Sequence, residues 1–191
     1  MSGEMIVDFA SVLERAKRGD EVAVGTIWRT LHPRLVRFLR ARAGDAADDV
    51  ASETWLAVAR HLRSFEGGED EFRAWLFTIG RRRLIDWQRR SRSRPATVAL
   101  DDVAPSFPAP DDPEGEALAT LGTSAALALV ARLPADQAEV ILLRVVAGLD
   151  TTRVAEVLGK RPGAVRMLQH RGLHALRALL DAGIETPAVT R

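Results

Sequence analysis

Apolar residues recur every three or four positions along most of this chain, and that spacing predicts helices. The first expected helix covers 9–17, and Asp20 is placed to cap a second helix that reaches Leu31. Pro33 is expected to interrupt this second helix or to begin a turn, after which the pattern continues to Gly44. No window alternates strictly between apolar and polar residues, so we expect no sheet.

Two more helices are expected before residue 95. Asp45 or Asp48 is placed to cap the first of them, which reaches Leu62. A loop is expected over 64–70, because this stretch contains a Gly-Gly pair. A long helix follows, with its apolar residues spread over 72–87, and it ends in a cluster of arginines. The first half of the chain is therefore predicted to be a four-helix domain.

The composition changes between Pro95 and Gly122. This stretch holds five prolines and few large apolar residues. It also holds six acids and no base between Asp101 and Glu116. Such a composition is typical of an extended, solvated linker. Helical spacing resumes near Ser124.

Four further helices are expected after the linker, over 124–133, 136–146, 151–158 and 162–180. The chain from Asp181 onward is expected to be frayed. We therefore predict an all-α fold of two small helical domains. The expected bounds are 1–94 for the first domain, 95–122 for the linker, 123–182 for the second domain and 183–191 for a flexible tail.

Composition restricts the chemistry that is available. Of the 191 residues, 47% are hydrophobic, which is enough for buried cores. Cysteine is absent, which excludes disulfides, thiolate zinc sites and cysteine nucleophiles. Residues 1–9 show no basic stretch before an apolar run, and no apolar stretch approaches about 20 residues. We therefore expect no signal peptide, no membrane insertion and a cytoplasmic location.

The net charge of +1 hides a strong segregation of charge. Residues 81–94 hold seven arginines against one acid, and residues 160–177 hold five basic residues and no acid. This patterning predicts two polyanion-binding faces that are joined by an acidic connector.

The stretch 150–177 has the pattern of a helix-turn-helix. Gly159 is placed for the left-handed turn after the helix expected at 151–158, and Pro162 stands at the first position of the next helix. The face opposite the apolar one presents Arg161, Ala164, Arg166, Met167, His170 and Arg171. Arginines on such a face can contact phosphates or bind guanine in the major groove. The alternative is an ordinary helical hairpin with a solvated basic face, although such a face usually mixes signs.

No pattern in the sequence supports catalysis. His170 and His174 are four residues apart, as metal ligands on a helix can be, but they lack a third ligand nearby. The chain contains no nucleotide-binding glycine loop, no nucleophile elbow and no zinc-protease motif. We expect no enzyme activity, no cofactor and no metal.

Read together, the two halves resemble the extracytoplasmic-function sigma factors, the minimal two-domain branch of the sigma-70 family. Residues 47–55, ADDVASETW, resemble the family's polymerase-binding helix, which often has the sequence AEDLVQETF. Residues 72–79, FRAWLFTI, are similar to the family's F-R-x-W-L-F-x-I segment. The Leu-Pro pair at 133–134 and the segments 163–166 and 170–173 stand where the family has L-P, G-T-V-K/R and H-R-A-L. The match covers nearly the whole chain in the family's order.

This resemblance implies a sigma2-like first domain, a sigma4-like second domain and roles for particular residues. The core polymerase, through its β′ subunit, would be bound by Asp48, Asp49, Ser52 and Glu53. The −10 promoter strand would be held by Phe65, Glu66, Arg81, Arg82, Arg83, Arg89 and Arg90. The −35 element would be read by Thr152, Arg161, Ala164, Arg166, Met167, His170 and Arg171. The implied partners are the β′ and β subunits of core RNA polymerase, promoter DNA and an anti-sigma factor.

Alternatives remain at three points. Asp48 and Asp49 also suit a helix start, where acids interact favourably with the helix dipole. Phe65 is either a platform for a DNA base or a buried anchor of its loop. The whole chain is either a polymerase subunit or a helix-turn-helix regulator that never joins the polymerase, and a sigma-like decoy is a further alternative.

Overall fold

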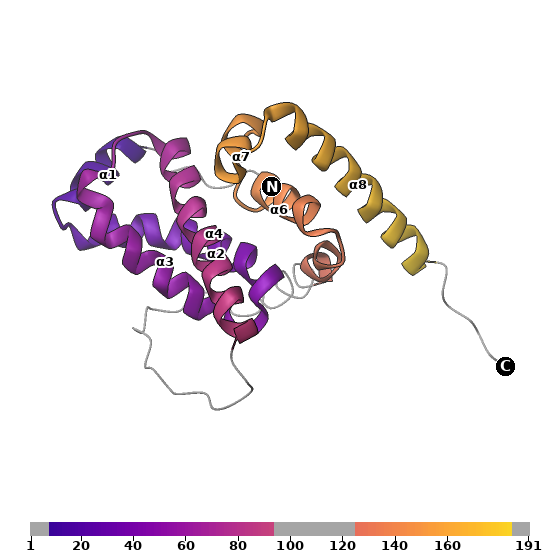
Figure 1. Ribbon diagram of the computed structural model, residues 1–191. Coiled ribbons are helices and arrows are strands. Elements are labelled where there is room, and N and C mark those ends of the chain that lie inside the picture. Colours follow the sequence, from indigo (N-terminus) through magenta and orange to yellow (C-terminus); the bar gives the residue numbers. More distant parts are fainter. Residues whose placement is uncertain (1–7, 94–124, 185–191) are drawn as a thin grey trace.

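The computed structural model describes residues 8–93 and 125–184, and all of its regular structure is helical. The N-terminal helices are α1 (Phe9–Lys17), α2 (Glu21–Ala43), α3 (Ala47–His61) and α4 (Glu69–Ser93), with the short 3-10 helices η1 (Gly44–Ala46) and η2 (Leu62–Ser64) on either side of α3 (Figure 1). A helix at 125–131 is followed by α6 (Ala135–Val145), α7 (Thr151–Leu158) and α8 (Pro162–Ile184). Within these two stretches no strand occurs, in agreement with the predicted all-α fold. The expected linker lies outside the described residues.

The first domain is held together by an aromatic and aliphatic core between α2, α3 and α4. Phe38, Phe72 and Phe77 are fully buried, and the rings of Phe38 and Phe77 meet edge to face with centroids 5.4 Å apart. The predicted cap at Asp20 is confirmed, because its carboxylate accepts hydrogen bonds from the backbone N–H groups of Val22 and Ala23. The ring contact joins α2 to α4, and the cap fixes where α2 begins.

The expected interruption at Pro33 is wrong, because α2 runs past it without a break. A proline inside a helix costs about 3 kcal/mol, since it lacks the N–H and crowds the preceding turn. Leu31 and Leu35, on either side of Pro33, are 1% and 0% exposed, and each buried leucine contributes roughly 1.5–3 kcal/mol. Burial of the apolar face on both sides of the proline therefore outweighs the local penalty.

The expected cap of α3 is also wrong, since neither Asp45 nor Asp48 caps it. The N-cap residue is Ala46, at the end of η1, and it makes no side-chain hydrogen bond. Asp48 instead lies with Asp49 in the first turn of α3. Both carboxylates interact there with the positive end of the helix dipole and remain on the surface.

Two element boundaries differ from the sequence expectation. The loop predicted at 64–70 is shortened to 65–68, because η2 precedes it and α4 begins at Glu69. Gly67 has a φ of 139°, a conformation that L side chains rarely adopt, so glycine is needed in this tight connection. At the other end of the chain, α8 continues to Ile184, beyond the point where fraying is expected.

The second domain has the predicted helix-turn-helix. Asp150 caps α7, and its carboxylate accepts from the Arg153 N–H at 2.7 Å. Gly159 ends α7 in the left-handed conformation, with a φ of 62°, and Pro162 begins α8 as predicted. Fully buried Val154 and Val165 belong to the core on which α7 and α8 pack.

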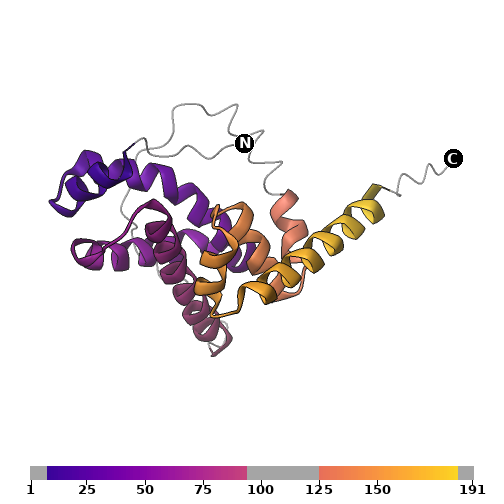
Figure 2. The same cartoon turned by 90° about the horizontal axis from the view of Figure 1, so that it is seen from above.

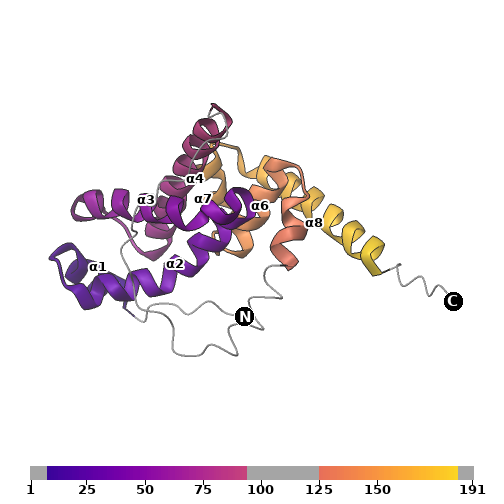
Figure 3. The same ribbon diagram turned by 90° about the horizontal axis from the view of Figure 1, so that it is seen from below.

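The two domains pack against each other. α7 contacts α4 and lies beside it in the views of Figure 1 and Figure 3. The C-terminal part of α8 projects away from both domains (Figure 2). The structure is therefore closed, with the helix-turn-helix placed against the N-terminal domain.

Candidate functional site

The first candidate surface is the acidic side of α3. Asp48 and Asp49 are exposed, whereas Ser52 and Glu53 are half-buried. Two arginines from neighbouring helices pair with this surface: Arg40 Nη2 lies 3.1 Å from Asp48 Oδ2, and Arg90 Nη2 lies 3.3 Å from Glu53 Oε2. Exposed pairs of this kind contribute only about 0–1 kcal/mol, so a cationic partner can replace the arginines at little cost.

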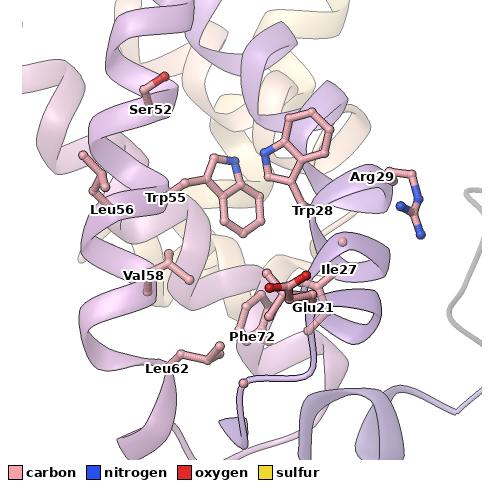
Figure 4. Close-up of a pocket in the computed structure, with 14 residues that line it drawn as sticks. Glu21, Ile27, Trp28, Arg29, Ser52, Trp55, Leu56, Val58, Leu62 and Phe72 are labelled. Atoms are coloured by element: carbon pink, nitrogen blue, oxygen red, sulfur yellow. The ribbon is translucent and has the colours of Figure 1, made fainter. Parts of the chain in front are cut away.

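An apolar groove lies next to this surface, between α2 and α3 (Figure 4). It has a volume of about 650 Å³, and Trp28 from α2 and Trp55 from α3 both line it. Trp28 stacks on His32 with centroids 4.3 Å apart, and burial lowers the pKa of that imidazole. The sequence reasoning missed this groove. A signal for it exists in Leu56, which is apolar although it stands outside the apolar stripe of its helix, and which is 55% exposed in the structure.

The second candidate surface combines the loop 65–68 with α4. Phe65 is half-buried and packs against Phe72 and Trp75, with ring centroids 5.2 and 4.9 Å away. These contacts match the loop-anchor alternative for Phe65. Glu66 beside it is exposed.

The arginines of α4 do not form one face. Successive residues point about 100° apart around a helix, so Arg81, Arg82 and Arg83 point in three directions. Arg82 and Arg89 are exposed and, being seven residues apart, share a side. Arg83 is half-buried, and Arg90 is exposed beside Glu53. The exposed basic surface of α4 therefore includes fewer of these arginines than their clustering in the sequence suggests.

Arg81 faces the second domain. Its guanidinium lies 3.2 Å from Glu139 of α6, and Arg42 of α2 approaches the other oxygen of the same carboxylate at 4.0 Å. Glu139 is only 6% exposed, although it belongs to the apolar helix α6. Burial of a carboxylate is expensive without cationic partners, so the two arginines account for its presence there.

Two further contacts join the domains at the other end of the interface. Arg73 is buried, pairs with Glu69 at 2.9 Å and donates to the carbonyl oxygen of Gly148 at 3.4 Å. Arg153 of α7 pairs with Glu71 in the first turn of α4. The pKa of Glu71 is lowered by backbone hydrogen bonds, including the one from Gly68, and by Arg153. Sequence reasoning missed all of these partners.

The third candidate surface is the outer side of the helix-turn-helix. Its exposed members are Thr152, Arg161, Arg166, Met167, His170 and Arg171, while Ala164 is half-buried. Neither Arg166 nor Arg171 takes part in an ion pair with the other residues that the structure describes. Six of these seven predicted residues are therefore exposed, and both arginines are available to an anion.

Residues 8–93 and 125–184 show no sign of a metal site or of a membrane span. In these ranges no three histidine or acidic side chains gather in a way that could hold a metal ion. None of the helices described there is long and apolar enough to cross a membrane.

Both halves of this chain are similar to known proteins. The model of sigma-70 region 2 matches residues 27–94, and that of sigma-70 region 4 matches residues 124–176. The ECF RNA polymerase sigma factor ShbA of Streptomyces griseus is 35% identical over 90% of this chain and 94% of its own. CnrH, in its complex with the cytosolic domain of CnrY, is 26% identical and has a TM-score of 0.63, with 90% of this chain and 96% of CnrH covered. The sigma factor RpoE of Bartonella quintana, in complex with the anti-sigma factor NepR, shares the fold at 22% identity and a TM-score of 0.60, over 83% and 96% of the chains.

Proposed function

Because this chain belongs to the sigma-70 family and is an alternative RNA polymerase sigma factor of the extracytoplasmic-function type, we propose that its three surfaces divide the work of promoter recognition. The acidic side of α3 binds core RNA polymerase through the β′ subunit. The loop 65–68 and α4 hold the −10 strand, and the outer face of the helix-turn-helix reads the −35 element. The chain acts in the cytoplasm as an initiation factor and has no catalytic role of its own.

The observation that carries this proposal is the separation of charge on the structure. The acids Asp48 and Asp49 lie exposed on α3, whereas Arg166 and Arg171 lie exposed on α8. A basic protein surface and a nucleic acid are thus attracted to different helices. A regulator that only binds DNA has no use for the acidic surface, and so the polymerase-bound function explains more of the molecule.

The −10 assignment is supported by two features of α4. Arg82 and Arg89 are exposed on one side of the helix, where they can contact the backbone of a single strand. Phe65 is anchored on Trp75, so it positions the loop instead of offering a free ring. We therefore propose that the loop receives the flipped base with its backbone and with Glu66, while Arg82 and Arg89 hold the strand further along α4.

We also infer an anti-sigma partner. The family resemblance implies such a protein, and the solved relative CnrH is bound to the cytosolic domain of CnrY. A protein of this class would act by covering the α3 surface or by keeping the two domains closed.

The test is run-off transcription with purified core polymerase on fragmented genomic DNA from the source organism, with and without this chain. We expect discrete new start sites that share −35 and −10 sequences. Binding to core polymerase without any new start would favour a decoy. Binding to duplex DNA without any binding to the polymerase would favour a conventional regulator.

A further inference from the structure

Glu71, in the first turn of α4, holds the loop 65–68 through a hydrogen bond to its backbone. The carbonyl oxygen of Gly68 accepts from the Phe72 N–H at 3.0 Å, as the capping residue of a helix does. The Gly68 N–H in turn donates to Glu71 Oε2 at 3.0 Å. This is the acidic half of a capping box, in which a glutamate three positions into the helix binds the backbone of the capping residue. Because glycine has no side chain for the other half, this end of the loop depends on Glu71.

The stem of Glu71 also packs directly on the loop. A Cβ atom on Gly67 would lie 2.7 Å from Glu71 Cβ and 3.2 Å from Phe65 Cζ. The space where a side chain would stand at Gly67 is therefore taken by these two residues. The Phe65 ring is itself fixed on Trp75, with ring centroids 4.9 Å apart. The loop backbone is thus held by an aromatic anchor and by Glu71 together.

The part of the loop that Glu71 holds lies on the surface. Glu66, Gly67 and Gly68 are all exposed. Two successive glycines would leave this backbone with many accessible conformations. Hydrogen bonds to a base weaken steeply when donor and acceptor are misaligned, so recognition needs one loop geometry. A contact that restricts the two glycines in advance lowers the entropy cost of binding.

The second oxygen of the Glu71 carboxylate makes a separate contact. Arg153 of α7 pairs with Oε1, whereas the Gly68 N–H bonds to Oε2. The bond to the loop therefore does not depend on Arg153. It is compatible with the closed structure and equally with a separation of the two domains.

We propose that Glu71 is a positioning residue for −10 recognition: its carboxylate fixes the backbone of the loop 65–68 in the geometry that receives the flipped base. The inference rests on the proposed role of this loop and adds a residue that does not itself touch the DNA. Glu71 acts through Gly67 and Gly68, so it governs the preference for the −10 sequence. The attraction for the phosphate backbone comes from Arg82 and Arg89 and does not depend on it.

The test measures sequence preference, which a simple loss of folded protein does not change. Holoenzyme is assembled from core polymerase and each full-length variant. Fluorescence anisotropy then gives its affinity for a labelled single strand with the mapped −10 sequence and for a scrambled strand of the same composition. Glu71→Ala should lower the ratio of the two affinities by about fivefold, the effect of one hydrogen bond of ordinary strength.

Two further variants separate the hydrogen bond from the charge. Glu71→Gln should keep the affinity ratio within about twofold of the unchanged chain, because the amide oxygen still accepts from the Gly68 N–H. Asp70→Ala is the matched control, since it removes another acid from the same turn at a side chain that is 70% exposed. It should also keep the ratio within about twofold.

A second measurement follows the bond itself. Hydrogen exchange of the Gly68 amide in the free chain, measured by NMR, should be about threefold faster or more in Glu71→Ala, and it should be unchanged in Asp70→Ala. Equal exchange rates in the unchanged chain and in Glu71→Ala would overturn the proposal, because the loop would then not be held by this carboxylate.

The two levels of the proposal fail in different ways. If the unchanged holoenzyme prefers the −10 strand and Glu71→Ala keeps that preference, Glu71 does not position the loop and the −10 role of the loop stands. An equal loss in Glu71→Gln or in Asp70→Ala would also overturn the positioning role. If the unchanged holoenzyme shows no preference between the strands, the proposed role of the loop fails and the inference about Glu71 fails with it.

Discussion

Arg81 Nη2 lies 3.2 Å from the Oε2 atom of Glu139, although the two residues are 58 positions apart in the chain. One is an arginine to which the family resemblance gives a role in holding promoter DNA, and the other is the buried acid of α6. In this closed arrangement Glu139 of the second domain pairs with a cation that we propose to be a contact of the −10 strand. The pair therefore relates domain closure to DNA binding.

Glu139→Gln should increase the affinity of the free chain for single-stranded DNA that carries the −10 sequence found by run-off mapping. The change removes the charge that holds Arg81, and we expect about a fivefold gain, which corresponds to about 1 kcal/mol. Fluorescence anisotropy with a labelled oligonucleotide measures it. Asp136→Asn is the control, because it also removes one acid from α6 and releases one cation, Lys160. Equal gains in both variants would show a simple effect of net charge.

Arg166→Ala should weaken binding of the holoenzyme to the mapped promoter. Arg166 is exposed on the outer face of α8, and loss of a base or phosphate contact there costs about 1–3 kcal/mol, or at least fivefold in affinity. Gel-shift titration at fixed salt measures the change. Arg177→Ala makes the same substitution further along α8 and should have less than a twofold effect. A similar loss in both variants would contradict the assignment of the −35 surface.

Gly80→Ala should destabilise the first domain. A Cβ atom on Gly80 would lie 2.8 Å from Leu35 Cδ1 in the packed core, and overpacking of this kind costs roughly 1–3 kcal/mol. Urea unfolding followed by tryptophan fluorescence measures the loss. Gly25→Ala is the control: its Cβ would meet only the flexible end of Arg29, so the better helix propensity of alanine should leave stability unchanged or raised by up to about 1 kcal/mol. Stability that is unchanged in Gly80→Ala would show that α2 and α4 can move apart.

His32 should make the stability of the chain depend on pH. Burial lowers the pKa of His32 in the folded protein, although nearby Asp48 acts in the opposite direction. In the unfolded chain the imidazole gains a proton near pH 6.5, at about the ordinary value for histidine. Below that pH the unfolded chain binds more protons than the folded chain, so falling pH favours unfolding.

His32→Phe keeps a ring beside Trp28 and removes the titrating group. The urea midpoint of the unchanged chain should fall between pH 7.5 and 5.5, and the midpoint of His32→Phe should fall less. His174→Phe, at an exposed position on α8, is the matched control. Identical pH profiles for the unchanged chain and His32→Phe would exclude His32 as a source of the dependence.

The sequence predicts those parts of the fold that depend only on residues close together along the chain. The caps at Asp20 and the left-handed turn at Gly159 are confirmed, because each is set by local backbone geometry. The prediction fails at Pro33, where the burial of flanking leucines overrides a local rule. The predicted cap of α3 is wrong for a different reason. A short 3-10 helix connects α2 directly to α3, so neither Asp45 nor Asp48 stands at the N-cap position of α3.

The candidate site also has parts that the sequence predicts and parts that it does not. The exposure of Arg161, Arg166, Met167, His170 and Arg171 follows from helical spacing, whereas Ala164, which the same spacing places with them, is half-buried. The pairing of Arg81 with Glu139 and the groove between Trp28 and Trp55 join residues from different elements. Helical periodicity says which side of a helix is apolar, but it does not say which other helix that side will meet, so these features appear only once the chain is folded.

The exposure of α8 in the closed structure has a consequence for the search through a genome. With Arg81 paired with Glu139, a free molecule offers duplex DNA one cation fewer on α4, while Arg166 and Arg171 on α8 stay exposed. Non-specific affinity rises steeply with the number of phosphates that are neutralised, and the chromosome supplies an enormous excess of competing sites. A molecule that holds back some of its cations is titrated less by that excess. We therefore expect fewer of the free molecules to be held at non-specific sites on the chromosome than an open arrangement of the same domains would allow.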